Sequence, residues 1–478
     1  MEQLFLDLKE KMEIFVKEAL PISERTQIKE EYFSPQYRIT KTNPSIIECY
    51  SDSFTPWNFD HRMGNIDIIS QLKSYRDALE LCKIIPECKL LADKQLFGLC
   101  IGRGMSYKYI PLQFLLSMIF NERSYYFRQE TFDKIFSDFM SILSNDHFSK
   151  AVVITPLIGL NSDIEIINLE IGIRIRKTTA DEFVKLLNKF SNLDLYHTTS
   201  PFEQVTHLLE IDWQFHWEFI DSSDYAKIGN SSQAAIFQNR LKINEEIMIL
   251  RALTKSCISI KGYCIDYQGW LADRSLGGFA NSYHILPWGL PTGTSSYLLN
   301  KEIQAYLNYR EKYLNLPENA SKHKIFFAMR KLAFGLEKLY GCDEIFDTIS
   351  GLEGLLVPAM TNGKRTREKQ KKCINAVSSM FTGKIQDLAS LKNDLEAAYR
   401  FRNDVAHGDI TFDDPDISLA DPHPKDKYLK EICRIRKYRQ ITRETLFEAI
   451  KLCIDNPLLV PPKSQRIQGN HSPHKHIF

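Results

Sequence analysis

The hydrophobic pattern of the first 150 residues is mainly that of helices. Leu4, Leu8 and Met12 lie four positions apart with polar residues between them, which predicts an amphipathic helix at the start of the chain. Similar periodicity recurs further along, so we expect this region to be mostly helical. The expected helices cover residues 1–20, 70–93, 111–120 and 129–144.

The pattern changes after residue 150. Residues 151–160 form a compact apolar run, and residues 164–175 alternate between apolar and polar positions, which is typical of strands. Thr178 and Thr179 then offer an N-cap for a helix that runs to about residue 190. Two more strands are expected at 205–220 and 257–267. The middle of the chain is therefore expected to be α+β.

A segment rich in Pro, Gly, Thr and Ser, LPWGLPTGTSS, predicts a linker over residues 286–297. Helical periodicity follows it, with helices expected at 298–315, 321–340, 343–357, 365–381, 384–407 and 424–454. The predicted fold class is multidomain. An N-terminal α+β region, 1–300, would precede a C-terminal all-α helical bundle, 298–478. The N-terminal region can be subdivided into a helical part, 1–150, and an α+β part, 151–285.

Composition adds few constraints. The chain has 478 residues, of which 44% are hydrophobic and 25% charged, as in soluble globular proteins. No apolar stretch is long enough to cross a membrane, and the N-terminus lacks the basic segment of a signal peptide. The ten cysteines contain no CxxC pair, which favours free thiols over a zinc or redox site. We therefore expect a cytoplasmic protein without a membrane partner.

The net charge of +1 conceals an uneven distribution. From residue 321 onward there are 27 basic and 20 acidic residues, whereas the rest of the chain has 34 and 40. One such run is usually a solvated helix face, but two clustered runs in the same region favour a polyanionic partner. The basic residues expected to contact it are Lys364, Arg365, Arg367, Lys369, Lys371, Lys372, Lys430, Arg434 and Lys437.

The most informative motif is YRFRNDVAHG, residues 399–408, at the end of a predicted helix. The apolar stripe of that helix leads to Arg402, where a charge is costly unless it is paired or lies at an interface. Asn403 and His407 are four positions apart and share a face, with Arg402 at its edge. Gly408 fits a helix stop. Three polar side chains can thus converge near the end of the helix.

This motif resembles the Arg-x4-6-His signature of the HEPN superfamily, in the Arg-Asn-x-x-x-His-Gly form of Apea-like HEPN domains. An upstream segment, GLEGLLV at residues 351–357, is similar to the LEALL-type segment of that family. A basic segment lies between the two, as it does in Apea-like domains. The resemblance covers residues 321–455, about a quarter of the chain.

The resemblance implies metal-independent RNA cleavage, in which a ribose 2′-oxygen attacks the adjacent phosphorus and leaves a 2′,3′-cyclic phosphate. His407 would be the acid/base and Arg402 would stabilise the phosphoryl oxygens. Asn403 would position the phosphate or orient His407, and Asp404 and Glu353 are weaker catalytic candidates. No metal or cofactor is expected.

The resemblance also implies a homodimer through the HEPN domain, with motifs from two copies in one site. The biological setting would be a prokaryotic anti-phage (abortive infection) or stress-response system. There the N-terminal region would respond to a trigger such as a phage component or a nucleotide signal. Three alternatives stay open. They are a non-catalytic HEPN scaffold that binds RNA or nucleotides, a helical protein-interaction module, and an Arg and His that only cap their helix.

Overall fold

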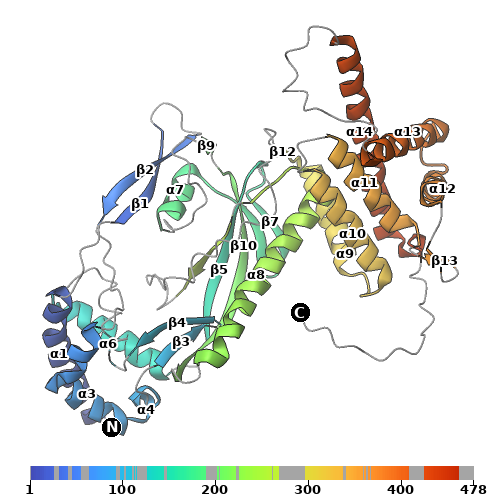
Figure 1. The fold of residues 1–478 in the computed structure, drawn as a ribbon. Helices are drawn as coiled ribbons and strands as arrows, with labels where there is room; N and C mark the ends of the chain where they lie inside the picture. Colours follow the sequence, from blue (N-terminus) through green and yellow to red (C-terminus); the bar gives the residue numbers. More distant parts are fainter. Residues whose placement is uncertain are drawn as a thin grey trace. The chain divides into compact units, whose positions relative to one another are not determined.

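A computed structural model shows a mixed α+β fold with mostly helical content (Figure 1). It describes residues 2–25, 32–40, 46–54, 64–92, 97–101, 104–109, 112, 115, 126–144, 148–189, 202–203, 205–221, 225–260, 262–268, 296–336, 341–358, 360–361, 364–365, 368–407 and 425–461. Within those ranges, every helix is too short or too polar to cross a membrane.

Contacts divide the chain into two compact units. The first consists of Met1–Leu157, Glu165–Ile243 and Lys261–Leu286, and the second of Ile158–Ile164, Asn244–Ile260 and Pro287–Phe478. The second unit therefore includes two short stretches from the middle of the chain. Helix α8 (Tyr225–Thr254) contributes its first part to one unit and its last turns to the other.

The helices of the first unit follow the apolar periodicity. The expected helix at 129–144 is confirmed as α6 (Gln129–Ser144), and the N-terminal helix as α1 (Glu2–Arg25). The expected helix at 70–93 is instead divided between α2 (Gly64–Gln71), α3 (Lys73–Ile84) and α4 (Pro86–Ala92). Ile85 is extended because the ring of the following Pro86 disfavours helical backbone before it. The expected helix at 111–120 lies almost wholly outside the described residues.

The main sheet of the first unit is antiparallel and is centred on β10 (His207–Asp221). Its order is β11-β5-β10-β3-β4, and β8 also pairs with β10 and with β7. The other strands are β5 (Phe148–Leu157), β7 (Ile166–Glu170), β8 (Ile173–Lys177), β11 (Cys264–Tyr267), β3 (Phe97–Ile101) and β4 (Gly104–Tyr109).

Two strand predictions in this sheet need correction. Residues 164–175 do not form a single strand but the hairpin β7–β8. Gly172, with φ of 80°, allows the tight reversal because it lacks a side chain. The alternation continues through the turn, which is why the pattern did not reveal it. The expected strand at 257–267 is reduced to β11, preceded by a single bridge between Ser259 and Ile158.

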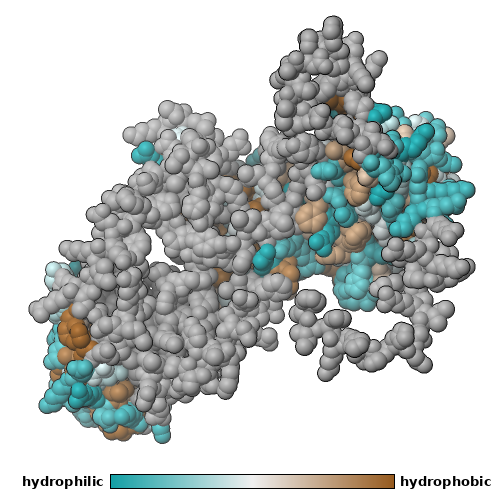
Figure 2. Space-filling model, in the orientation of Figure 1, coloured by the Kyte–Doolittle hydropathy of each residue, from teal (hydrophilic) through white to brown (hydrophobic). Residues whose placement is uncertain are grey.

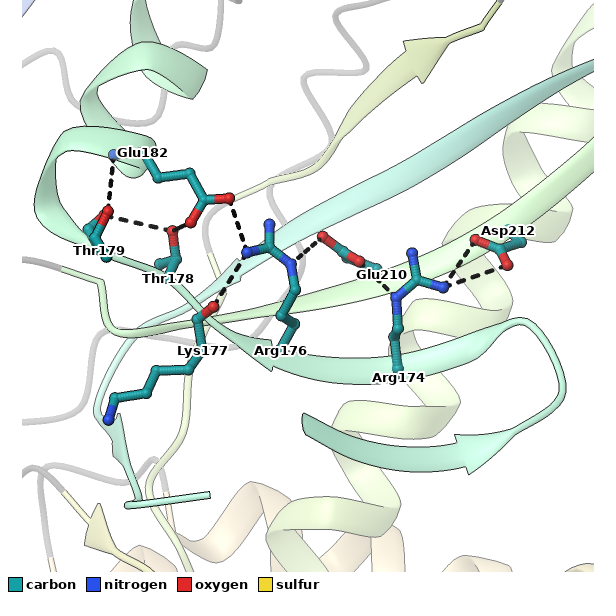
Figure 3. A network of polar contacts seen from close by, with 8 residues as sticks. All are labelled: Arg174, Arg176, Lys177, Thr178, Thr179, Glu182, Glu210 and Asp212. Atoms are coloured by element: carbon teal, nitrogen blue, oxygen red, sulfur yellow. Dashed lines mark hydrogen bonds and ion pairs between the residues drawn. The ribbon is translucent and has the colours of Figure 1, made fainter. Parts of the chain in front are cut away.

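A ladder of ion pairs fixes the β8–β10 pairing (Figure 3). Glu210, which is 5% exposed, accepts hydrogen bonds from Arg174 at 2.7 Å and from Arg176 at 2.9 Å. Arg176 also binds Glu182 of α7 (Ala180–Lys189) at 2.8 Å. The amide of Glu182 donates to the Thr179 hydroxyl at 3.2 Å, so the expected N-cap is present. These charges are mutually neutralised, and the ladder is a structural connection between sheet and helix.

The described part of residues 1–150 is mainly helical, as expected, but the prediction omitted two groups of strands. The described residues include β3 and β4 of the main sheet and a second, antiparallel sheet of order β1-β2-β9. The members of this second sheet are β1 (Tyr32–Ile39), β2 (Ile46–Phe54) and β9 (Phe202–Glu203). Pro35 lies in the edge strand β1, where a missing amide proton is tolerated. That proline and the polar residues of β2 hide the strand alternation in the sequence.

Helix α8 was not predicted, because its first half is mostly polar and has little apolar periodicity. Its last turns belong to the second unit and bury Glu246, whose carboxylate pairs with Arg310 of α9 (Asn300–Leu314) at 2.7 Å. Residues 286–295 of the expected linker lie outside the described residues. The next two residues form β12 (Ser296–Tyr297), which pairs with β6 (Leu160–Asn161), so this end of the linker is a strand.

The helices of the second unit match the expected positions closely. After α9 come α10 (Ala320–Gly335), α11 (Gly341–Leu356), α12 (Lys369–Phe381), α13 (Leu388–His407), α14 (Lys425–Asp455) and the 3₁₀ turn Pro457–Leu459. Ile349 and Leu352 of α11 are fully buried. A side chain at Gly351 would come within 2.7 Å of Leu446 of α14, so the glycine permits a close helix contact.

The C-terminal part, residues 298–478, was expected to be all helical, but it also contains a short strand pair. In it, β13 (Met360–Thr361) pairs with β14 (Lys364–Arg365). The expected helix at 365–381 therefore begins only at Lys369. The run of basic residues from 364 to 372 is divided between a strand and a helix start, and it does not form one basic helix face.

Candidate functional site

The candidate site lies at the C-terminal end of α13. Asp387 begins this helix by accepting a hydrogen bond from the Ser390 amide at 2.8 Å. Leu395, Ala398 and Tyr399 hold its inner face, each no more than 1% exposed. The helix ends at His407, where a basic side chain is favoured by the helix dipole. Gly408, the expected stop, lies outside the described residues.

Arg402 is half-buried and is held by two contacts. Its guanidinium carbon lies 4.6 Å from the ring centroid of Phe346 on α11, and its Nη1 donates to Asn403 Oδ1 at 3.1 Å. Its Nε is buried and has no hydrogen-bond partner among the described residues. A guanidinium carries five N–H donors, and those of the two Nη atoms that do not bind Asn403 have no partner among the described residues. The arginine expected to be costly is thus stabilised by an aromatic ring.

Asn403 is half-buried, whereas Asp404 and His407 are exposed. Successive side chains on an α-helix are rotated by about 100°, so Asn403 and His407 point within about 40° of each other. By the same count Arg402 and His407 diverge by about 140°. Asn403 is therefore hydrogen-bonded to Arg402 and lies on the same face of the helix as His407. Arg402 and Asn403 are brought together, and no hydrogen bond to His407 occurs in the described part of the chain.

Glu353 of α11 is half-buried, and its charge acts on Tyr399 and Cys373. Burial raises the pKa of Tyr399, and the neighbouring Cys373 and Glu353 raise it further. Burial also raises the pKa of the Cys373 thiol to about 12, with Glu353 contributing in the same direction. Tyr399 and Cys373 are therefore neutral at physiological pH, and neither is a nucleophile. Glu353 is therefore near these two residues, and among the described residues no hydrogen bond or ion pair joins it to Arg402.

The predicted RNA-contacting residues have different environments. Lys369, Lys371 and Lys372 are exposed in the first turn of α12, and Arg434 is exposed on α14 with its guanidinium 5.2 Å from the Phe401 ring. Lys437 forms an ion pair with Asp394 of α13 at 2.6 Å, so part of its charge is already compensated. Figure 2 shows hydrophilic side chains gathered over the region of α12 and α13. The structure describes the backbone but not the side chains of Lys364, Arg365 and Lys430. Arg367 lies outside the described residues.

Two arginines of the second basic run are structural. Glu344 of α11 is fully buried, and each of its carboxylate oxygens is bound by an arginine of α14. Arg439 donates from Nε to Oε2 at 2.6 Å, and Arg443 donates from Nε to Oε1 at 2.6 Å. These two charges therefore hold α11 against α14 and do not belong to a polyanion-binding face.

Phe346 and Tyr399 were missed as members of the site. Phe346 is 39% exposed although it lies on a helix that is otherwise well buried on its inner face. The sequence offered only weak signals, because an isolated Phe or Tyr in a helix most often belongs to a core. Within the described residues, His, Cys, Asp and Glu side chains form no group of three that could hold a metal ion.

No protein-family model, curated protein or solved structure matches this chain.

Proposed function

We propose that this protein is a metal-independent endoribonuclease of the HEPN type, with its active site at the end of α13. The observation that carries the proposal is the environment of Arg402, which contacts Phe346 and Asn403 while most of its N–H donors have no partner among the described residues. Such a fixed cation is suited to bind a phosphodiester. The imidazole of His407, five residues further along the same helix, is exposed.

In the proposed reaction His407 removes the proton from a ribose 2′-hydroxyl. The 2′-oxygen attacks the adjacent phosphorus, the bond from phosphorus to the 5′-oxygen breaks, and Arg402 stabilises the charge on the phosphoryl oxygens. The leaving 5′-oxygen takes up a proton, which gives a 2′,3′-cyclic phosphate and a 5′-hydroxyl. Asn403 keeps the guanidinium oriented. Asp404 and Glu353 have secondary roles at most, since among the described residues no hydrogen bond or ion pair joins either of them to Arg402, Asn403 or His407.

The divergence of Arg402 and His407 on one helix favours a homodimer. If two α13 ends face each other across a two-fold axis, the His407 of one copy can approach the phosphate held by Arg402 of the second copy. A composite site of this kind also explains how one short motif per chain can suffice.

The resemblance suggests a cytoplasmic effector of prokaryotic anti-phage defence or stress response, which degrades RNA and stops growth. The region up to residue 300 then has the role of sensing a trigger, such as a phage component or a nucleotide signal. The exposed lysines of α12 and Arg434 of α14 would contribute to RNA binding.

The direct test is cleavage of end-labelled single-stranded RNA by purified protein in the presence of a chelator. We expect products with 2′,3′-cyclic phosphate ends, and a loss of more than about 100-fold in rate for His407→Ala and Arg402→Ala. Arg400→Ala is the matched control, because Arg400 is an exposed arginine on the same helix and no described contact joins it to Arg402, Asn403 or His407. Cleavage that persists in both site variants would overturn the proposal.

A second candidate is a non-catalytic HEPN scaffold that binds RNA. The observation that favours it is the isolation of His407, which lacks a hydrogen-bond partner within the described residues to orient its ring. The scaffold predicts salt-sensitive RNA binding that survives His407→Ala and leaves the RNA intact.

A further inference from the structure

Phe346 is the residue of α11 whose exposure is least expected. Ile345 and Ile349, on the inner face of the same helix, are fully buried, while the Phe346 residue is 39% exposed. Exposing a phenyl ring has no benefit for stability, since burial of an aromatic side chain is favourable. One such ring alone needs no explanation. What distinguishes Phe346 is the guanidinium of Arg402, which lies 4.6 Å from its centroid.

Phe346 and Arg402 together present a cation beside an aromatic ring, which neither residue presents alone. Arg402 places a planar cation beside a partly exposed aromatic ring. Asn403 accepts one of its hydrogen bonds, and its remaining N–H donors have no partner among the described residues. Asp347, the acid next to Phe346, is neutralised by Lys331 at 2.7 Å. A negatively charged ligand therefore meets no unpaired carboxylate from that neighbour. The result is a place for a phosphate next to a flat apolar surface.

Nucleic-acid bases that are not paired or stacked bind to surfaces of this kind. Unpaired bases stack on aromatic rings and on guanidinium planes, whereas the bases of a duplex are hidden within their own stack. We propose that Phe346 and Arg402 form a stacking platform for one unpaired base adjacent to the phosphate that Arg402 binds. The substrate is then single-stranded RNA, and Phe346 is a positioning residue that sets the register of the strand. This inference rests on the proposed function for the nature of the ligand.

The test measures binding without cleavage. A short single-stranded oligonucleotide with 2′-O-methyl riboses is titrated with the full chain carrying His407→Ala, and affinity is followed by fluorescence anisotropy. We expect Phe346→Ala and Phe346→Leu to weaken binding about tenfold and Phe346→Trp to bind like the parent, as stacking on a base requires. Leu preserves apolar bulk, so a loss with Leu is not a loss of packing volume.

Phe327→Ala is the matched control. Phe327 is 40% exposed on α10 and has no guanidinium over its ring among the described contacts, so its removal should leave affinity unchanged. The second arm replaces the bases of the oligonucleotide by abasic sites, which should abolish the difference between Phe346 and Phe346→Ala. The same RNA annealed to its complement should bind weakly and without dependence on residue 346.

Equal binding by Phe346→Leu and the parent, or an undiminished effect with abasic RNA, would overturn the platform. These outcomes are distinct from failure of the nuclease proposal, because the oligonucleotide is not cleavable. RNA cleavage by the wild type with no effect at Phe346 leaves the nuclease and removes the platform. If Phe346 contributes to base stacking but ordinary RNA is not cleaved, the platform stands and the nuclease proposal fails.

Discussion

Asn403 accepts a hydrogen bond from its sequence neighbour Arg402, with 3.1 Å between Oδ1 and Nη1. The two residues therefore act as one unit although their side chains leave the helix in different directions. Together with the ring of Phe346, this bond defines where the guanidinium lies. A site that depends on a preorganised cation should be sensitive to the residues that orient it.

Replacing Asn403 by Ala should reduce RNA cleavage about 10- to 100-fold, because Arg402 would lose the acceptor that orients it. Asp404→Ala is the control. Asp404 is adjacent but exposed, and its loss should change the rate less than about threefold. Single-turnover rates at saturating RNA would separate this effect from weaker binding. A larger effect at Asp404 than at Asn403 would contradict the arrangement.

The exposed lysines of α12 should contribute to affinity and to its dependence on salt. Lys371→Ala combined with Lys372→Ala should lower the slope of log K against log salt by about 1.4, at about 0.7 per phosphate contact with single-stranded RNA. Lys437→Ala should have a smaller effect, since Lys437 is paired with Asp394. Binding isotherms at four salt concentrations measure the slopes. An unchanged slope in the double variant would place the RNA elsewhere.

Glu344 is expected to matter for stability and not for chemistry. Glu344→Gln leaves Arg439 and Arg443 without their buried counter-charge, and we expect it to lower the free energy of unfolding by about 2–3 kcal/mol, since both arginines can reach solvent in part. Asp394→Asn breaks a more exposed pair and should cost less than about 1 kcal/mol. Urea denaturation of both variants tests the ranking, and equal midpoints would contradict it.

Buried thiols should make the protein less stable at alkaline pH. Burial raises the pKa of both Cys373 and Cys453 from 9.0 to about 12. Each thiol keeps its proton longer in the folded than in the unfolded chain, so its contribution is complete below pH 9 and is lost as the pH rises toward 12. The melting temperature between pH 7 and 10.5 should therefore fall above pH 9.

Cys373→Ala should flatten that decline, because it removes one of the titrating groups. The comparison is Cys433→Ala, which removes an exposed thiol on α14 and should leave the slope of the wild type unchanged. A decline that is identical in all three proteins would show that Cys373 does not contribute to it.

The sequence predicted most of the helices of the second unit, because each has a regular apolar stripe that is buried in the structure. The position of Arg402, Asn403 and His407 at one helix end followed from the same stripe. Phe346 could not be found in this way, since its contact with Arg402 joins residues on two different helices. Periodicity assigns a face to each helix but does not identify which helix that face meets.

The strands of the first unit were harder to predict. The alternation of β7 and β8 runs through the turn at Gly172, so the pattern could not distinguish a hairpin from one long strand. In β1, Pro35 interrupts the strand signal, and its tolerance there depends on the edge position, which only the sheet order reveals. The roles of basic residues were also hard to predict. In the sequence Arg439 and Arg443 resemble surface charges, and only the structure shows that both bind the buried Glu344.

The most direct test of the central claim is to induce the wild type and His407→Ala at equal levels in cells and to map RNA ends. The account predicts that new 2′,3′-cyclic phosphate ends accumulate with the wild type and stop growth, and that both effects are absent with His407→Ala. Equal growth arrest and equal RNA ends in the two strains would contradict a ribonuclease that acts through His407.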